Sequence, residues 1–248
     1  MIDHSPSFFP DKSICFSLWG DQPHYYIGAI KNAELVKLYL PEWLCVFFVH
    51  KDVPKRIQDQ LLKHGLIVVI DDAPNHLGMF WRWSYLISDQ LYRTIHDGFI
   101  KQKLYFLSRD CDSRITKREA DEINAWVESG KTFHSIIAHP YHNIPMLGGL
   151  WGCIITTDLI NNFTQWMAEY KQSALYSDRY QVDQDFLSKF VYPFAKNDMF
   201  VSNMMFKQQN PDYSFIGEGL NEHDEPIVPH HREVLKSYTE ILYPIYHK

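Results

Sequence analysis

The chain has 248 residues, of which 46% are hydrophobic and 22% are charged, which is the composition of a folded globular protein. A formal net charge of −6 and the lack of a basic run argue against a nucleic-acid surface, because phosphate neutralisation requires clustered lysines and arginines. No apolar run approaches the roughly 18 residues of a membrane span, so we expect no transmembrane segment.

The first seventy residues alternate between short apolar runs and segments of helical spacing. Strands are expected at residues 14–19, 43–49 and 66–70, with a helix in each interval and Gly65 capping the second helix. Strand and helix alternating in this way build a parallel sheet buried on both faces. The expected fold class is therefore α/β.

Further elements follow in the same style as far as residue 190. Residues 79–92 read as a helix and 103–108 as a strand, after which Thr116 and Glu119 form a capping box for a helix that ends at Gly130. Two more strands and two more helices are then expected, at residues 133–138, 147–156, 158–170 and 183–190. From residue 196 the periodicity fades, and we expect an irregular segment.

The cysteines and the first residues bear on the compartment. Each cysteine lies in or beside an apolar run, without the spacing of a metal site, and they are Cys15, Cys45, Cys111 and Cys153. We expect buried, reduced thiols, which are typical of a reducing compartment. Residues 1–10 lack the pattern of a signal peptide. A cytoplasmic location is the expectation.

The most informative feature is an apolar strand that runs into two carboxylates. Asp110 and Asp112 follow the strand at 103–108, and side chains two residues apart on an extended segment point the same way. Carboxylate oxygens suit Mg²⁺ or Mn²⁺, which share their other positions with water and substrate phosphates. Because ligands bind at the carboxyl ends of strands in open α/β sheets, the pair predicts a metal-bound diphosphate. A solvated loop end is the alternative.

Three segments together resemble a known family. They are Ser-Arg-Asp-Cys-Asp-Ser-Arg at 108–114, Pro-Met-Leu-Gly-Gly-Leu-Trp-Gly at 145–152 and Asp-Gln-Asp-Phe-Leu at 183–187. Their order and spacing are similar to those of the nucleotide-sugar-dependent glycosyltransferases of the GT-A fold, and the last segment looks like that of the retaining, glycogenin-like galactosyl- and glucosyltransferases. The resemblance implies a GT-A type fold, which is a Rossmann-like, mostly parallel mixed sheet flanked by helices.

The resemblance also implies an activity. It is the metal-dependent transfer of a hexose, preferably from a UDP-sugar and with retention, to a hydroxyl of an unknown glycan, lipid or protein acceptor. The cofactor would be Mn²⁺ or Mg²⁺ on Asp110 and Asp112. One domain over residues 1–248 would then contain a nucleotide-binding half at about 14–115, a donor-sugar and acceptor half at about 116–195, and the irregular segment at 196–248.

Further residues receive roles from the same resemblance. Gly148 and Gly149 would allow the donor sugar to approach the backbone, although a bulge or turn explains them equally well. A carboxylate or amide near the anomeric carbon or the acceptor hydroxyl would come from Asp183, Gln184 or Asp185. A helix N-cap is the other explanation of Asp183.

Arginines are the candidates for direct phosphate contact, because a guanidinium fork matches phosphate oxygens. They are Arg82, Arg109 and Arg114, with surface ion pairs as the alternative for each. Arg82 stands within Phe-Trp-Arg-Trp at 80–83, a setting that favours a partly buried charge that requires a partner.

The nucleoside and a third metal ligand are placed by position and resemblance. Ser17 and Trp19 at the end of the first strand would contact the nucleoside, and Asp72 after the third strand would contact the base or ribose. Glycogenin-like enzymes often add a late histidine to the metal, and among the late histidines we take His231. The chain lacks their usual histidine, glycine and lysine-proline-tryptophan signature there.

Two other functions fit parts of the pattern. A haloacid-dehalogenase-like phosphotransferase also has a strand ending in Asp-x-Asp, but on its first strand, whereas three strands are expected before Asp110 here. A non-catalytic nucleotide-sugar or carbohydrate-binding module would keep the fold without turnover.

Overall fold

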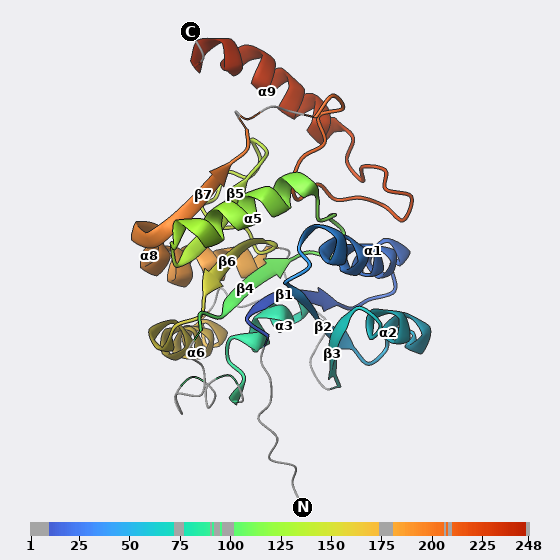
Figure 1. The fold of residues 1–248 in the computed structure, drawn as a ribbon, viewed down its shortest axis with the longest axis vertical. Helices are drawn as coiled ribbons and strands as arrows, with labels where there is room; N and C mark the ends of the chain where they lie inside the picture. Colours follow the sequence, from blue (N-terminus) through green and yellow to red (C-terminus); the bar gives the residue numbers. More distant parts are fainter. Residues whose placement is uncertain are drawn as a thin grey trace, which may run out of the picture.

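A seven-stranded mixed sheet forms the centre of the computed structural model, which describes residues 10–71, 77–89, 91, 95, 102–173, 181–205, 207 and 210–246 (Figure 1). The strand order is β3-β2-β1-β4-β6-β5-β7, and β6 runs antiparallel to both of its neighbours. The strands are β1 Lys12–Leu18, β2 Leu44–His50, β3 Gly65–Ile70, β4 Tyr105–Arg109, β5 Phe133–Ile137, β6 Leu150–Ile154 and β7 Met199–Asn203.

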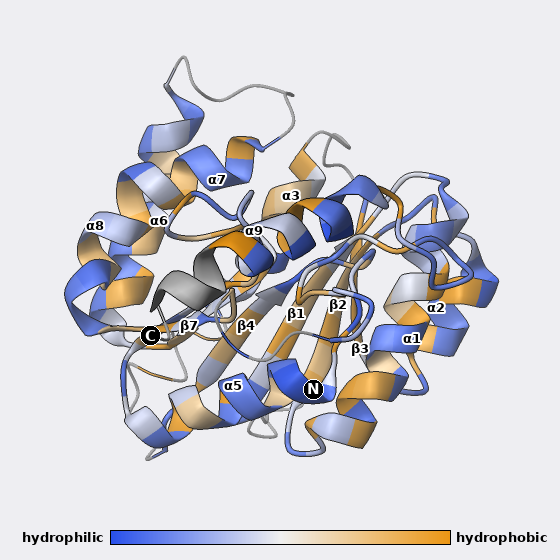
Figure 2. Ribbon diagram, turned by 90° about the horizontal axis from the view of Figure 1, so that it is seen from above, coloured by the Kyte–Doolittle hydropathy of each residue, from blue (hydrophilic) through white to orange (hydrophobic). Residues whose placement is uncertain are grey.

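Helices cover both faces of the sheet, and the central strands between them are apolar (Figure 2). One face carries α1 Pro23–Tyr39, α2 Lys55–Leu61 and α5 Lys117–Ser129. The other carries α3 Gly78–Trp81, the 3₁₀ turn η2 Arg82–Tyr85, α6 Thr157–Lys171, α7 Val182–Phe186, the π-helical η3 Leu187–Val191 and α8 Tyr192–Ala195. After α8 come the 3₁₀ turn η4 Lys196–Asp198, then β7 and finally α9 His230–Tyr246.

Strand alternation explains why the sheet needs two cores. Ile14 and Phe16 of β1 pack into the core under α1 and α5, while Cys15 between them packs into the core under α3 and α6. Because both of their faces are buried, the central strands β1, β2, β4 and β6 are mostly apolar rather than alternating. The expected α/β fold, a mostly parallel sheet flanked by helices, is confirmed.

Local signals for α5 are confirmed as well. Thr116 Oγ1 accepts the Glu119 amide at 3.1 Å, and Gly130 ends the helix in the left-handed region at φ 70°. All four cysteines are buried and free, as expected. Among the described helices none has the length and apolar character needed to cross a membrane.

Three expectations need correction. The helix expected at 79–92 is a short α3 followed by η2, with its later residues partly outside the described ranges. Gly65 begins β3 instead of capping α2, and a side chain there would meet the carbonyl of Cys45 at 2.4 Å. The segment from 196 onward contains β7 and α9, between which the chain crosses towards α1 (Figure 1).

Candidate active site

A cavity of about 580 Å³ lies at the sheet edge where β1 and β4 end and the antiparallel β6 begins. Its walls also come from α3, from the β5–β6 loop, from the start of α7 and from the segment between β7 and α9. The predicted site residues that line it are Ser17, Trp19, Arg82, Asp110, Asp112, Gly148, Gly149, Asp183, Gln184 and His231. The carboxyl edge of the sheet thus gathers residues from six separate segments, as the fold class predicts.

Arg82 lies at the centre of this group. Its Nη1 pairs with Asp110 Oδ1, its Nη2 donates to Asp183 Oδ2 at 3.0 Å, and its side chain is only 4% exposed. Burial alone would lower the pKa of Arg82, but the two carboxylates raise it. The guanidinium therefore stays charged and joins two aspartates that are far apart in sequence.

Gly148 and Gly149 leave the space that the carboxylates of Asp183 and Asp110 occupy. A Cβ on Gly148 would lie 1.9 Å from Asp183 Oδ2, and a Cβ on Gly149 would lie 1.8 Å from Asp110 Oδ2. Any side chain at either position would displace a carboxylate from the cavity. The close approach that requires these glycines is thus made by the protein's own aspartates, whereas the sequence led us to expect a sugar.

Asp110 and Asp112, the expected metal ligands, both line the cavity. The side chain of Asp110 is 50% exposed, and the pKa of Asp112 is raised to about 6 by burial and by the neighbouring Asp110. Two like charges held together in this way fit a hard divalent cation that keeps water or phosphate oxygens as its other ligands. Within the described ranges no three His, Cys, Asp or Glu side chains form a metal-binding group, so His231 lines the cavity without completing one.

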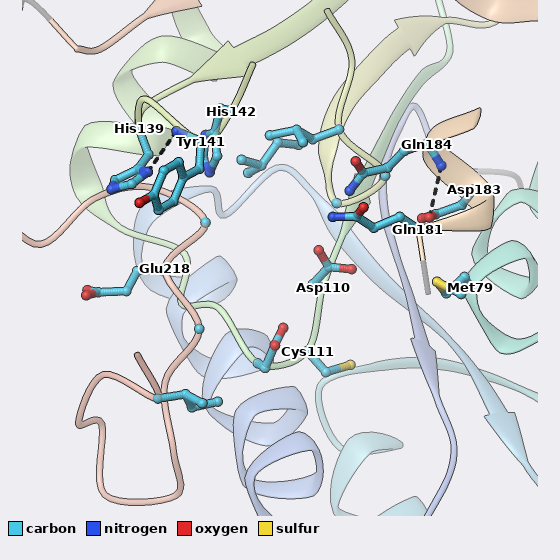
Figure 3. Close-up of a pocket in the computed structure, with 18 of the residues that line it drawn as sticks. Met79, Asp110, Cys111, His139, Tyr141, His142, Gln181, Asp183, Gln184 and Glu218 are labelled. Atoms are coloured by element: carbon cyan, nitrogen blue, oxygen red, sulfur yellow. Dashed lines mark hydrogen bonds between the residues drawn. The ribbon is translucent and has the colours of Figure 1, made fainter. Parts of the chain in front are cut away.

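Asp183 stands in the first turn of α7 and is 4% exposed. The N-cap of α7 is Gln181, at φ 70°, so the capping alternative for Asp183 is wrong. Burial raises the pKa of Asp183 to about 6, Arg82 opposes this, and Asp110 adds to it. Figure 3 shows Asp183 and Gln184 on one side of the cavity with Asp110 facing them. Asp185 lies two positions further round the helix and is not among the lining residues.

Arg109 is a correction, because it does not reach the cavity. The expected strand ended at Ser108, but β4 continues through Arg109, so the two side chains point to opposite faces. Ser108 Oγ donates to the Gly148 carbonyl at 2.6 Å on the cavity side, whereas Arg109 pairs with Glu119 of α5 and is 1% exposed. Arg109 is therefore part of the core.

Arg114 is also turned away from the cavity. Its Nε donates to Asp224 at 2.9 Å and its Nη2 donates to the Asn221 carbonyl at 3.0 Å. The backbone makes the same connection, because the Leu220 amide donates to the Asp112 carbonyl at 2.8 Å. Arg114 fastens the loop that carries the two aspartates to the late segment. Asp72, expected to contact the base or ribose, lies outside the described residues.

Sequence reasoning missed the support of this loop. Asn32 of α1 donates to the Ser113 carbonyl at 2.8 Å, and its Oδ1 accepts the Ile115 amide at 2.9 Å. A polar residue beside Ala29 and Ala33 in the buried stripe of α1 was the available signal. Other lining residues were missed as well, and they include His139, Tyr141, His142, Phe215 and Glu218.

No family model matches the chain, and no curated protein matches it. Similar solved structures include a glycosyltransferase involved in glycosylation of the major capsid of PBCV-1, at 14% identity over 80% of this chain and 84% of that one, with a TM-score of 0.45. They include a 4-diphosphocytidyl-2C-methyl-D-erythritol synthase from Anaerococcus prevotii, at 12% identity over 92% and 95%, with a TM-score of 0.46.

A third similar structure is a mannosyltransferase from Pyrobaculum calidifontis in complex with GDP-mannose and Mn²⁺. The identity is 9%, the TM-score is 0.47, and the match covers 80% of this chain but only 55% of the mannosyltransferase. At identities of 14% and below, these likenesses say nothing about substrate.

Proposed function

We propose that the chain is a metal-dependent glycosyltransferase that moves a hexose from a nucleotide diphosphate sugar, with UDP favoured, to a hydroxyl acceptor. The observation that carries the proposal is the convergence of Asp110, Asp112 and Asp183 around Arg82 in one cavity at the carboxyl edge of the sheet. Breaking a sugar–phosphate bond develops negative charge on the leaving group and positive charge on the sugar. A site for this reaction needs both signs of charge close together.

Asp110 and Asp112 would hold Mn²⁺ or Mg²⁺. When bound, the ion supplies the positive charge that stabilises a departing diphosphate. Among the described lining residues, Arg82 is the only lysine or arginine, and it is already paired with two aspartates. A bare diphosphate would therefore meet a negative wall, and the carboxylates favour its entry only together with a cation.

The nucleoside would lie at the end of β1. Ser17 Oγ accepts the backbone amide of Arg82 at 2.9 Å, which couples this strand end to the centre of the site. The ring of Trp19 packs against Gly78 so closely that a Cβ there would lie 2.4 Å from it. Trp19 is thereby fixed at the cavity, where its ring offers a flat surface to a base.

The sugar would lie between Asp110 and Asp183. Arg82 holds these two carboxylates in a fixed relation, so that one serves the cation and the other faces the sugar. Asp183 then stabilises positive charge at the anomeric carbon, and Gln184 beside it offers an amide to a hydroxyl. Retention of anomeric configuration is part of the proposal.

The rival phosphotransferase needs a nucleophilic aspartate after its first strand. Here the first strand leads to Ser17, and the Asp-x-Asp segment follows β4. Asp110 is also paired with Arg82, which lowers the nucleophilicity of a carboxylate. No observation favours this rival.

The test is release of nucleoside diphosphate from UDP- and GDP-sugars with Mn²⁺. We expect Asp110→Asn, Asp112→Asn to reduce release by about 100-fold or more, while Asp121→Asn, which removes an exposed carboxylate on α5, changes it little. Excess EDTA should abolish donor binding, and NMR of the product should show retention.

The contrary outcomes identify the other functions. Donor binding without release would indicate a binding module. A phosphoryl group on Asp110 after incubation with a phosphate ester and Mg²⁺ would indicate the phosphotransferase. Unchanged donor affinity in EDTA would refute the metal-dependent mechanism.

A further inference from the structure

The cavity has a second wall that the chemistry proposed above does not use. This imidazole wall consists of His139, Tyr141 and His142 from the β5–β6 loop, Phe215 from the late segment and His231 at the start of α9. Figure 3 shows His139, Tyr141 and His142 across the cavity from Asp183 and Gln184, with Asp110 between the two groups. A molecule on this wall would face a donor sugar held at Asp183.

His139 makes the wall rigid. Its Nδ1 accepts the Tyr141 amide at 3.0 Å, so its Nε2 carries the proton that is donated to the His231 carbonyl at 2.8 Å. The His139 ring also lies 4.5 Å from the Phe215 ring and 5.0 Å from the Tyr141 ring, measured between centroids. One buried imidazole thus joins the β5–β6 loop to α9.

His142 is fixed as a neutral hydrogen-bond donor. Its Nδ1 accepts the Ala138 amide at 3.2 Å, so in the neutral ring the proton is on Nε2. Burial and the neighbouring His139 and His231 lower the pKa of His142 to about 3, so the ring remains neutral at any pH near neutrality. His142 therefore provides the cavity with an uncharged N–H donor.

The rim of the same wall is apolar and open. Tyr141, Ile227 and Val228 line the cavity and are 53%, 46% and 44% exposed. The Tyr141 ring and the neighbouring aliphatic side chains are complementary to the C–H face of a pyranose. The imidazole N–H is complementary to the hydroxyl groups at its edge. The pattern suits a ligand that has one apolar face and one hydroxylated edge.

The charge of the cavity further restricts the class of ligand that it can bind. Four lining carboxylates surround it, namely Asp110, Asp112, Asp183 and Glu218, and Arg82 is the only lysine or arginine among the described lining residues. Glu218 is neutralised by Arg232 from behind, at 2.6 and 2.8 Å, but this adds no positive charge to the wall. An acidic ligand would be repelled, and an uncharged one would not.

We infer that the imidazole wall is the acceptor subsite and that the acceptor presents an uncharged sugar ring, stacked on Tyr141 and bonded by His142. This inference rests on the proposed function, since an acceptor is needed only if a hexose is transferred. It names a substrate class where the site at Asp110 and Asp183 specifies only the donor.

The experiment is saturation-transfer NMR of the full chain with methyl β-D-galactopyranoside and methyl α-D-glucopyranoside, and with the corresponding uronic acid glycosides. We expect saturation of at least one neutral glycoside and about three- to tenfold weaker binding in Tyr141→Ala, as for loss of one stacked ring. Tyr141→Phe should retain binding, which separates ring stacking from misfolding. His142→Phe should weaken binding about fivefold, as for one lost hydrogen bond.

Phe194→Ala is the matched control, because Phe194 is 43% exposed on α8 and packs against Trp166 away from the cavity. It should not change glycoside binding.

Equal saturation of the uronic acids, or none from the neutral glycosides, would overturn the inference. UDP binding with Mn²⁺ is measured in parallel on the wild type. UDP binding without glycoside binding refutes only the acceptor subsite, and glycoside binding without UDP binding refutes the proposed function.

Discussion

Two buried arginines lie on opposite faces of the same strand end. Arg109 points under α5 and pairs with Glu119, and both side chains are at most 2% exposed. Arg82 lies on the cavity face, donates to the Arg109 carbonyl at 3.0 Å, and pairs with Asp110, which is 50% exposed. The chemistry of the two ion pairs is the same, but only one of them has a carboxylate that solvent can reach.

This difference in solvent access gives the two ion pairs different roles, one structural and one functional. A sealed pair cannot exchange its partner, so Arg109 and Glu119 can only hold α5 against the sheet. An open pair can be rearranged by an incoming cation, because Asp110 keeps oxygen lone pairs towards the cavity.

The largest expected effect is loss of the sealed pair. Glu119→Ala leaves Arg109 charged and unpaired in the core, which should lower the free energy of unfolding by about 3–5 kcal/mol. Urea denaturation of the wild type and the variant measures this loss in the free energy of unfolding. Asp121→Ala, which breaks the exposed pair with Lys117 on the same helix, should cost about 0–1 kcal/mol. Equal losses in the two variants would mean that the Arg109 pair contributes no more than a surface one.

The second prediction concerns pH and Asp183, the buried second partner of Arg82. Asp183 has a pKa of about 6 in the folded protein against an ordinary value of 3.8, so the folded state binds its proton more tightly than the unfolded chain. The free energy of unfolding should therefore fall as pH rises from about 4 to 6, by roughly 3 kcal/mol from this group. Asp112, whose pKa is also raised to about 6, adds a change of the same sign.

Urea denaturation in EDTA at several pH values measures this fall. Asp183→Asn removes the titrating group while keeping its shape, so the variant should lose part of the pH dependence and be more stable than the wild type at pH 7. Parallel stability curves for the two proteins would show that Arg82 compensates the burial of Asp183 completely.

The two arginines also show how far sequence reasoning reaches. Asp110 was placed correctly at a strand end because the apolar run before it is unmistakable. Arg109 was misplaced because the strand was taken to end one residue early, and alternation turns a one-residue error into the opposite face. The partner of Arg82 was expected but its identity was not, since Asp183 is 101 residues away.

The late segment explains the rest of what was missed. β7 is only partly buried, and its apolar run, Met199 to Val201, is shorter than the four or more residues that mark a buried strand. Phe215 and Glu218 reach the cavity from irregular backbone, where no spacing rule applies. Both residues are positioned by contacts with residues that are remote in sequence, and local sequence patterns do not predict such contacts.

The third prediction tests the room around the open pair. Gly149→Ala places a methyl group on the Asp110 carboxylate, which must move away from Arg82 or from the cavity. We expect a loss of about 1–3 kcal/mol in stability, as for an overpacked site, and weaker Mn²⁺ binding by titration calorimetry. Gly130→Ala is the control, because a Cβ there meets nothing and the cost is only the left-handed backbone. Unchanged Mn²⁺ affinity in Gly149→Ala would show that Asp110 does not hold the ion.

The smallest expected effect comes from the support of the aspartate loop. Asn32→Leu removes the bonds to Ser113 and Ile115 and should cost about 1–2 kcal/mol in stability. Val36→Ala on the same buried face of α1 should cost a similar amount without touching the loop. If Asn32 sets the position of the two aspartates, only Asn32→Leu should also weaken Mn²⁺ binding, by about three- to tenfold for a ligand misplaced by the loss of its supporting hydrogen bonds. If both variants bind Mn²⁺ like the wild type, the loop keeps its shape through Arg114 and the late segment, and the open pair depends on the end of the chain more than on its beginning.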